Sequence, residues 1–226
     1  MLAVPNHVQA PPAYVRREVV LGRSEHGRPV IAWEIGDPRS RAVVLVVGCI
    51  HGNEPAGIAI ANALVRSRPP AHTLLWVVPV LNPDGLAAGT RQNGRGVDLN
   101  RNFPWRWRPL GPRGSPFYAG TGPMSERETR LAVSLIVRVH PRISVWFHQH
   151  LDLVDESGGD VRVERRFAQL VGMRAQRLPR YPGGVVNWEN ARFPGTTSFV
   201  VELPAGAVPA ARRAVFADAL RTLVVR

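Results

Sequence analysis

Apolar residues occur along the chain in short runs, and four of these runs carry no charge and are rich in β-branched and aromatic residues. Such runs predict buried strands, because a strand that is covered on both faces needs apolar residues at successive positions. Two more apolar stretches, at residues 17–21 and 29–35, flank a polar, glycine-containing segment and predict a hairpin. The four uncharged runs lie at residues 42–50, 73–80, 143–147 and 197–201.

Helices are predicted between the strands, where apolar residues recur on one face. Residues 55–66 begin with a proline, which is favoured at the first position of a helix. Residues 125–128 have the Ser-x-x-Glu spacing of a capping box and predict a helix that runs to about residue 139. We read Glu126 and Glu128 as structural. Two later segments, 164–174 and 207–225, are also predicted to be helical.

Three segments lack a regular pattern. Residues 1–13 contain three prolines and predict a loose N-terminal arm. Residues 86–122 form a long irregular stretch, which in a compact domain is usually functional or disordered. Within it, residues 91–104 combine amides and guanidinium groups that suit binding an anion, although a solvated loop has the same composition. Residues 151–160 predict an acidic loop. Because no linker divides the chain, we expect residues 1–226 to form one domain.

Polar residues of catalytic types stand where each of the four buried runs ends. The carboxyl ends of parallel strands share one edge of a sheet, so these side chains are expected to converge. Two histidines and one carboxylate, with a fourth position open, form a typical catalytic zinc site. We therefore predict one zinc ion held by His51, Glu54 and a second histidine. The alternative at the first strand is an ordinary strand-to-helix turn. The residues at the four ends are His51 with Glu54, Asn82, His148 and Glu202.

The second histidine is either His148 or His150, because residues two apart in an extended segment face the same side. Glu202 is not needed as a ligand, and partial burial at a strand end raises the pKa of a carboxylate toward the range of a general base. The alternative for Glu202 is a strand-end charge paired with an arginine. Cys49 is the only cysteine and lies inside an apolar run, which is typical of a core residue rather than a nucleophile.

The formal charge of +12 comes entirely from arginine, and the chain has no lysine. So basic a protein raises the possibility of nucleic-acid binding. The arginines are scattered, however, so nucleic acid is not expected as the main partner. No run approaches the ~20 apolar residues that cross a bilayer, and the N-terminus lacks a signal-peptide pattern. We expect a cytoplasmic protein, or an exported one if a leader has been removed. The sequence gives no oligomeric state.

Several motifs together resemble the zinc carboxypeptidase family. The resemblance implies an α/β fold, a three-layer α/β/α sandwich with a mixed, mostly parallel twisted sheet of about eight strands. It also implies one zinc ion per chain. The motifs, in chain order, are Leu21-Gly22-Arg23-Ser24 with Gly27-Arg28-Pro29, His51-Gly52-Asn53-Glu54, Asn82-Pro83-Asp84-Gly85, Gly96-Val97-Asp98-Leu99-Asn100-Arg101-Asn102-Phe103, and the strand that ends in Glu202.

The resemblance also implies roles for single residues. It favours His148 over His150 as the third metal ligand, beside His51 and Glu54. It implies that Glu202 is the general base and acid. It identifies Arg91 as the residue that polarises the scissile carbonyl group, with Arg95 close by as an alternative. The residues that it implies for substrate binding are Asn100 and Arg101, as a clamp for a carboxylate, and Tyr181, as a mobile cover.

The short chain, with segments 151–155 and 181–183, is most similar to bacterial murein peptide amidases, which cut the γ-D-glutamyl–diaminopimelate bond of cell-wall peptides. The partner would then be a small, cell-wall-derived peptide. We hypothesise that Asp152 or Asp155 meets the ammonium group of diaminopimelate. Three alternatives remain open: a metallocarboxypeptidase for other peptides, an N-acyl amino acid deacylase of the aspartoacylase and succinylglutamate desuccinylase type, and a catalytically inactive module that binds cell-wall peptides.

Overall fold

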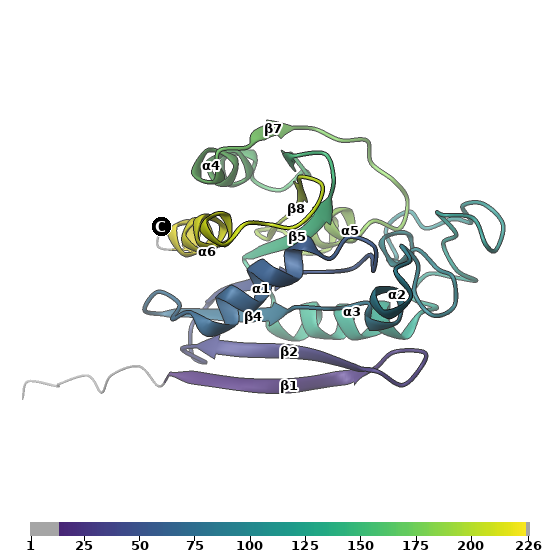
Figure 1. The fold of residues 1–226 in the computed structure, drawn as a ribbon, viewed down its shortest axis with the longest axis horizontal. Coiled ribbons are helices and arrows are strands. Elements are labelled where there is room, and N and C mark those ends of the chain that lie inside the picture. The colour runs from purple at the N-terminus through teal and green to yellow at the C-terminus, as the bar shows by residue number, and fades with distance from the viewer. Residues whose placement is uncertain (1–13, 225–226) are drawn as a thin grey trace, which may run out of the picture.

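One mixed β-sheet organises the computed structural model, which describes residues 14–224 (Figure 1). The spatial order of its strands is β1-β2-β4-β3-β5-β8-β6-β7. The four central strands, from β4 to β8, are mutually parallel, whereas β1, β2 and β6 pair in antiparallel fashion with their inner neighbours. The strands are β1 (Val15–Arg23), β2 (Pro29–Gly36), β3 (Ala42–Val47), β4 (Thr73–Val78), β5 (Ile143–Gln149), β6 (Leu153–Asp155), β7 (Arg174–Gln176) and β8 (Thr197–Leu203).

Helices cover both faces of this sheet, which confirms the predicted three-layer architecture. Alternate residues of β3 show the reason: Val44 and Val46 belong to the apolar cluster on one face, and Val43, Leu45 and Val47 to the cluster on the other. The first face packs against α1 (Ala56–Arg66), α4 (Val161–Val171) and α6 (Ala210–Val224). The second face packs against α3 (Arg127–Val139) and α5 (Val185–Arg192), together with the short helix η1 (Leu99–Arg101).

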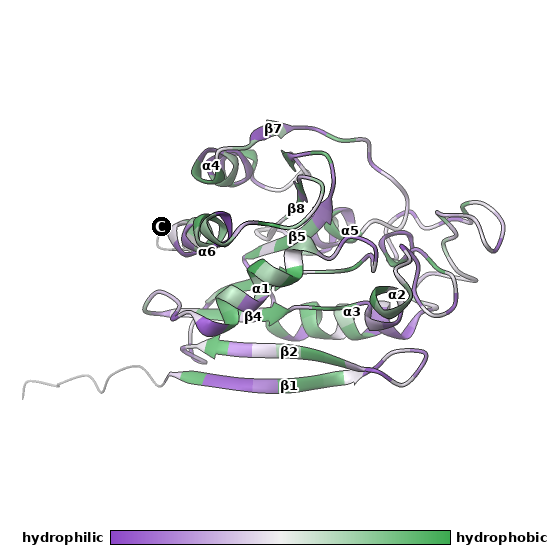
Figure 2. Cartoon of the chain, in the orientation of Figure 1, coloured by the Kyte–Doolittle hydropathy of each residue, from purple (hydrophilic) through white to green (hydrophobic). Residues whose placement is uncertain are grey.

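The edge of the sheet differs from its centre. Figure 2 shows a hydrophilic stretch in the first half of β1, the edge strand, which contains Arg16, Arg17 and Glu18 in succession. Charged residues on an edge strand oppose pairing with the edge of another sheet. By contrast, every residue of β4 is buried. Within residues 14–224, no helix is both long enough and apolar enough to span a bilayer.

The predicted capping box is wrong in its detail, although the helix is there. α3 begins at Arg127, and Glu126 occupies the N-cap without a side-chain cap bond. The reason is that both glutamates turn inward. The Nδ2 of Asn93 donates to Glu126 at 2.9 Å and to Glu128 at 3.0 Å. These buried bonds confirm the structural reading of both glutamates, and they attach the irregular segment 86–122 to α3.

The acidic segment 151–160 is not wholly a loop, because residues 153–155 form β6, which pairs with β8. α4 also begins earlier than predicted, at Val161, since the side chain of Asp160 accepts a hydrogen bond from the backbone N–H of Arg162. α4 ends before Gly172, which is left-handed, and the chain then enters β7. Two helices were not predicted, α2 (Pro83–Ala88) and α5. The expected arm at residues 1–13 lies outside the described residues.

Candidate metal centre and catalytic cleft

The carboxyl edge of the parallel strands collects the candidate residues, as the sequence predicted. His51 and Glu54 lie in the turn after β3, and His148 and Glu202 are the second-last residues of β5 and β8. His148 and Glu202 are direct partners in the register of these neighbouring strands. Asn82, after β4, has a structural role instead: its Oδ1 accepts from Gly85 N at 2.9 Å and caps α2.

The turn that carries His51 and Glu54 is held by close backbone packing. A Cβ atom on Gly52 would lie 1.9 Å from the carbonyl carbon of Gly85 in α2. Any other residue at position 52 would therefore push the turn away from α2. The absence of a side chain at position 52 therefore lets the turn rest against the segment that follows β4.

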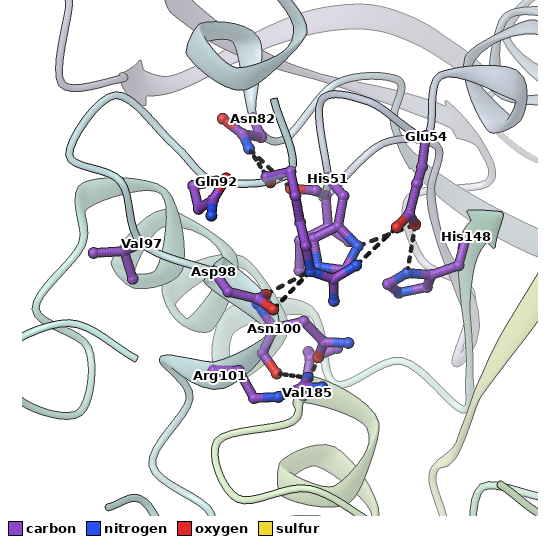
Figure 3. A network of polar contacts seen from close by, with 12 residues as sticks. His51, Glu54, Asn82, Gln92, Val97, Asp98, Asn100, Arg101, His148 and Val185 are labelled. Atoms are coloured by element: carbon purple, nitrogen blue, oxygen red, sulfur yellow. Dashed lines mark hydrogen bonds and ion pairs between the residues drawn. The ribbon is translucent and has the colours of Figure 1, made fainter. Parts of the chain in front are cut away.

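Three buried side chains converge on one point in this turn. His51, Glu54 and His148 each offer a ligand atom, and these atoms lie within 4.8 Å of one another. The Nδ1 atoms of both histidines are 3.0 Å from the same oxygen, Oε2 of Glu54. Figure 3 shows the three side chains pointing toward one another. Two imidazoles and a carboxylate in this arrangement fit a zinc ion with one open position.

The electrostatics of these residues agree with a cation site. Burial raises the pKa of Glu54, but the charges and hydrogen bonds of His51 and His148 outweigh it and hold the pKa well below its usual range. Nδ1 of His51 is buried and, apart from its 3.0 Å contact with Oε2 of Glu54, has no hydrogen-bond partner within residues 14–224. A divalent cation requires deprotonated ligands, and an imidazole nitrogen with a free lone pair and an ionised carboxylate are both of this kind.

Asp98 completes the surroundings of His51 and was not assigned a role from the sequence. It is fully buried, and its Oδ1 lies 3.0 Å from Nε2 of His51. A hydrogen bond from Nε2–H to this carboxylate fixes the tautomer in which Nδ1 has its lone pair free for a metal. The available sequence signal was that a metal-bound histidine usually needs a carboxylate partner, and Asp98 is the single acidic residue of segment 86–122.

Arg91, and not Arg95, reaches the metal cluster. Its Nη1 donates to Oε1 of Glu54 and its Nε donates to Oδ2 of Asp98, both at 2.9 Å. Arg95 is half-exposed and points toward Glu126, with 3.7 Å between Nε and Oε2. The structure therefore brings Arg91, and not Arg95, against the metal-ligand cluster.

Arg101 is the buried cation of the cleft. Its guanidinium carbon lies 4.5 Å from the ring centroid of Tyr181 and 5.6 Å from that of Phe117. Burial lowers the pKa of Arg101, although Asp98 opposes the shift. Asn100 is fixed by its Oδ1, which accepts from Val185 N at the start of α5 at 3.0 Å. The burial of Asp98 and Arg101 excludes the reading of residues 91–104 as a solvated loop.

One cavity of about 220 Å³ joins these residues. A larger cavity, of about 420 Å³, is lined by Ala42, Ile143 and Thr197, at the opposite ends of the parallel strands, and it contains none of the candidates. We take the smaller cavity as the cleft, because it includes two of the three metal-ligand candidates. The candidate residues that line it are Glu54, Arg91, Asn100, Arg101, His148, Tyr181 and Glu202.

Comparison with known proteins agrees with this geometry. A sequence model described as zinc carboxypeptidase matches residues 3–154. The chain belongs to the zinc carboxypeptidase family. Murein peptide amidase A of Escherichia coli K12 is 34% identical over 146 residues, and the match spans 60% of this chain and 60% of that relative. Carboxypeptidase B of Helicoverpa zea is 28% identical over 159 residues, and the match spans 56% of this chain and 37% of that relative.

Solved structures show the same fold. The murein-tripeptide amidase of Escherichia coli O157 superposes with a TM-score of 0.74 at 25% identity, and the match covers 95% of this chain and 94% of that one. Carboxypeptidase A of Helicoverpa armigera gives a TM-score of 0.75 at 19% identity, over 93% of this chain and 66% of that one. The zinc carboxypeptidase fold and a metal-ligand cluster typical of the family are therefore present in this chain.

Two further predictions concern His150 and Glu202, which lie near the metal-ligand cluster. His150 lies beyond the end of β5 and is exposed, so His148 is the histidine that joins the metal-ligand cluster. Glu202 lines the cleft, and its Oε2 is buried without a hydrogen-bond partner in the described part of the chain. The predicted alternative, a Glu202 charge paired with an arginine, is not seen among residues 14–224.

Proposed function

We propose that this protein hydrolyses an amide bond adjacent to a substrate carboxylate. We further propose that its substrates are murein peptides and that the bond it cuts is the γ-D-glutamyl–diaminopimelate bond. The observation that carries the proposal is the single cleft in which the metal-ligand cluster, Glu202, Arg91 and Arg101 meet. The similarity to murein peptide amidase A supports the choice of murein peptides over other peptides.

Each residue of the cleft has a role in this reaction. A zinc ion bound by His51, Glu54 and His148 would act as a Lewis acid and lower the pKa of a bound water to roughly 7. Glu202 accepts a proton from the attacking water and passes it to the leaving amine. The unpartnered Oε2 of Glu202, one strand away from His148, suits this transfer.

The arginines act on the substrate's oxygens. Arg91 donates hydrogen bonds to the carbonyl oxygen as negative charge builds on it. Arg101 and Asn100 hold the carboxylate next to the scissile bond, and a guanidinium in a buried cleft suits this contact. Tyr181 is half-exposed with its ring over Arg101, so it covers the bound carboxylate.

Product analysis tests the proposal. The zinc-loaded protein is incubated with murein tripeptide and with a dipeptide library, with and without chelator, and products are identified by mass spectrometry. Release of diaminopimelate, abolished by the chelator, is expected. Cleavage of the dipeptides with no preference for murein tripeptide would support an ordinary metallocarboxypeptidase instead.

Glu202→Gln supplies the control within the cleft. The amide keeps the size of the side chain but cannot accept the proton, so turnover is expected to fall by about 10²–10⁴. Zinc content, measured by atomic absorption, should stay at one per chain because Glu202 is not a ligand. Normal turnover in this variant would exclude Glu202 as the base.

A further inference from the structure

The segment between β7 and α5, which Figure 1 shows as a long connection, lines the cleft with four consecutive residues. Leu178, Pro179, Arg180 and Tyr181 all line the cavity. Tyr181 covers Arg101, so this lining is continuous with the carboxylate clamp. Arg180 is therefore a third arginine in the lining of the cavity, in addition to Arg91 and Arg101.

Arg180 is anchored from behind by a buried acid. Its Nη1 donates to Oδ2 of Asp155 at 2.6 Å, and its Nη2 donates to the carbonyl oxygen of Glu156. Asp155 is buried, and it also accepts from Ser157 Oγ at 2.7 Å and from Leu178 N at 2.8 Å. These three donors occupy most of the acceptor sites of the Asp155 carboxylate. Asp155 also lines the cleft, and its binding of a substrate ammonium stays a prediction.

Both Asp155 and Arg180 line the cleft, and Arg180 is the more exposed of the two. The Arg180 side chain is 21% exposed and the Asp155 side chain only 4%. A guanidinium has five N–H donors, and two of those of Arg180 have partners within residues 14–224. The remaining donors have the planar arrangement that matches a carboxylate.

The surroundings of Arg180 strengthen its preference for an anion. Val186 and Val200 line the same cavity and are almost fully buried, and the side chain of Arg180 is itself only 21% exposed. A charge-assisted hydrogen bond is stronger in such surroundings than in water. An apolar side chain alone would leave the free donors of Arg180 unsatisfied, which costs free energy.

We propose that Arg180 binds a second carboxylate of the substrate, at the end of the side chain of the residue that is released. This inference rests on the proposed function, because it assigns Arg101 to the carboxylate next to the scissile bond. Diaminopimelate fits the requirement, since it has a carboxylate at each end. A released residue whose side chain ends in an ammonium group alone does not fit.

Four γ-D-glutamyl substrates that differ only in the released residue test this. The residues are diaminopimelate, 2-aminopimelate (a distal carboxylate without the ammonium), lysine (an ammonium without the carboxylate) and norleucine (neither group). The native protein should have a higher kcat/KM for the two substrates with a distal carboxylate. Arg180→Met should lower that preference over norleucine by about 10–100-fold, the loss expected for one charge-assisted hydrogen bond.

Two more variants separate the recognition of charge from damage to the cleft lining. Arg177→Met removes an exposed arginine of the same segment that does not line the cavity, and it should leave the preference unchanged. Arg180→Lys keeps the charge without the planar fork and should restore part of the preference. Thermal melting and zinc content report whether each variant is folded and loaded.

Calorimetric binding of free 2-aminopimelate and norleucine gives a readout that does not need catalysis. Arg180-dependent binding of 2-aminopimelate, without hydrolysis of any of the four substrates, would keep the inference and reject the proposed function. Hydrolysis with equal losses on all four substrates in Arg180→Met would reject the inference alone. A native preference for the lysine substrate would also overturn it.

Discussion

Asp98 shows how one buried carboxylate can set the chemistry of a metal site. Its carboxylate accepts hydrogen bonds from His51, from Arg91 and from the backbone N–H of Asn100. Burial raises the pKa of Asp98, but the neighbouring His51 and Arg91 outweigh this effect and hold the pKa well below its usual range. Asp98 therefore stays ionised and orients one metal ligand and the candidate oxyanion arginine together.

Replacement of Asp98 by Asn tests this role. The amide lacks the negative charge that favours the His51 tautomer with a free lone pair on Nδ1. Zinc affinity is therefore expected to fall about 10–100-fold. Competition titration with a chromophoric chelator measures the affinity. Asp218→Asn, which changes an exposed aspartate on α6, serves as the matched control. Equal affinity of the Asp98 variant and the native protein would contradict the orienting role.

The position of a site residue is easier to predict from the sequence when the residue lies at the end of a strand than when it lies in a loop. His51, Glu54, His148 and Glu202 were identified because strand ends align at one edge. Asp98 meets His51 across 47 positions of sequence, and no periodic pattern encodes that contact. The orientation of Arg180 depends on Asp155, which the sequence placed in an acidic loop without indicating this contact. These contacts arise from tertiary packing, so they had to be observed.

At the scale of elements, the longer strands and the amphipathic helices were predictable, and the short elements were not. β6 and β7 have three residues each, too few to show an alternating pattern. α5 was missed because its eight residues are buried on several sides, including Trp188 and Glu189, so it shows no clear apolar face. α5 nevertheless supplies Val185 and Val186 beside the cleft.

The buried acid of α5 gives a pH prediction. Trp146 Nε1 on β5 donates to Oε1 of Glu189 at 2.9 Å, and burial raises the pKa of Glu189 to about 7 from an ordinary value of 4.5. The folded state therefore binds this proton more tightly than the unfolded state. The stabilising effect is complete below pH 4.5 and is lost as the pH rises to about 7, at a cost of about 3 kcal/mol.

Glu189→Gln removes this titration and keeps an acceptor oxygen for Trp146. The free energy of unfolding should fall less between pH 5 and pH 8 in the variant than in the native protein, as measured by urea denaturation. Glu164, whose pKa burial also raises to about 7, contributes with the same sign and remains in the variant. The exposed Glu18→Gln is the control. A native pH profile in Glu189→Gln would show that this carboxyl does not titrate as described.

At the scale of the whole molecule, the metal site joins parts of the chain that are distant in sequence. The turn after β3 supplies His51 and Glu54, and β5 supplies His148, with α1, β4 and α3 between them in sequence. Segment 86–122 closes over the same site through Asp98 and Arg101. A cation bound there would stabilise the folded state, because the unfolded chain does not hold these ligands together.

Removal of the metal should therefore lower the melting temperature. A ligand present at a hundred times its dissociation constant adds about 2.7 kcal/mol, which for a chain of this length corresponds to roughly 5–10 °C. Differential scanning calorimetry with and without chelator measures the shift, and atomic absorption confirms that zinc was removed. His51→Asn, which removes one ligand, should melt at one temperature under both conditions. An equal melting temperature for the zinc-loaded and zinc-free native protein would mean that the ion contributes nothing to the folded state, and that the cluster does not hold it tightly.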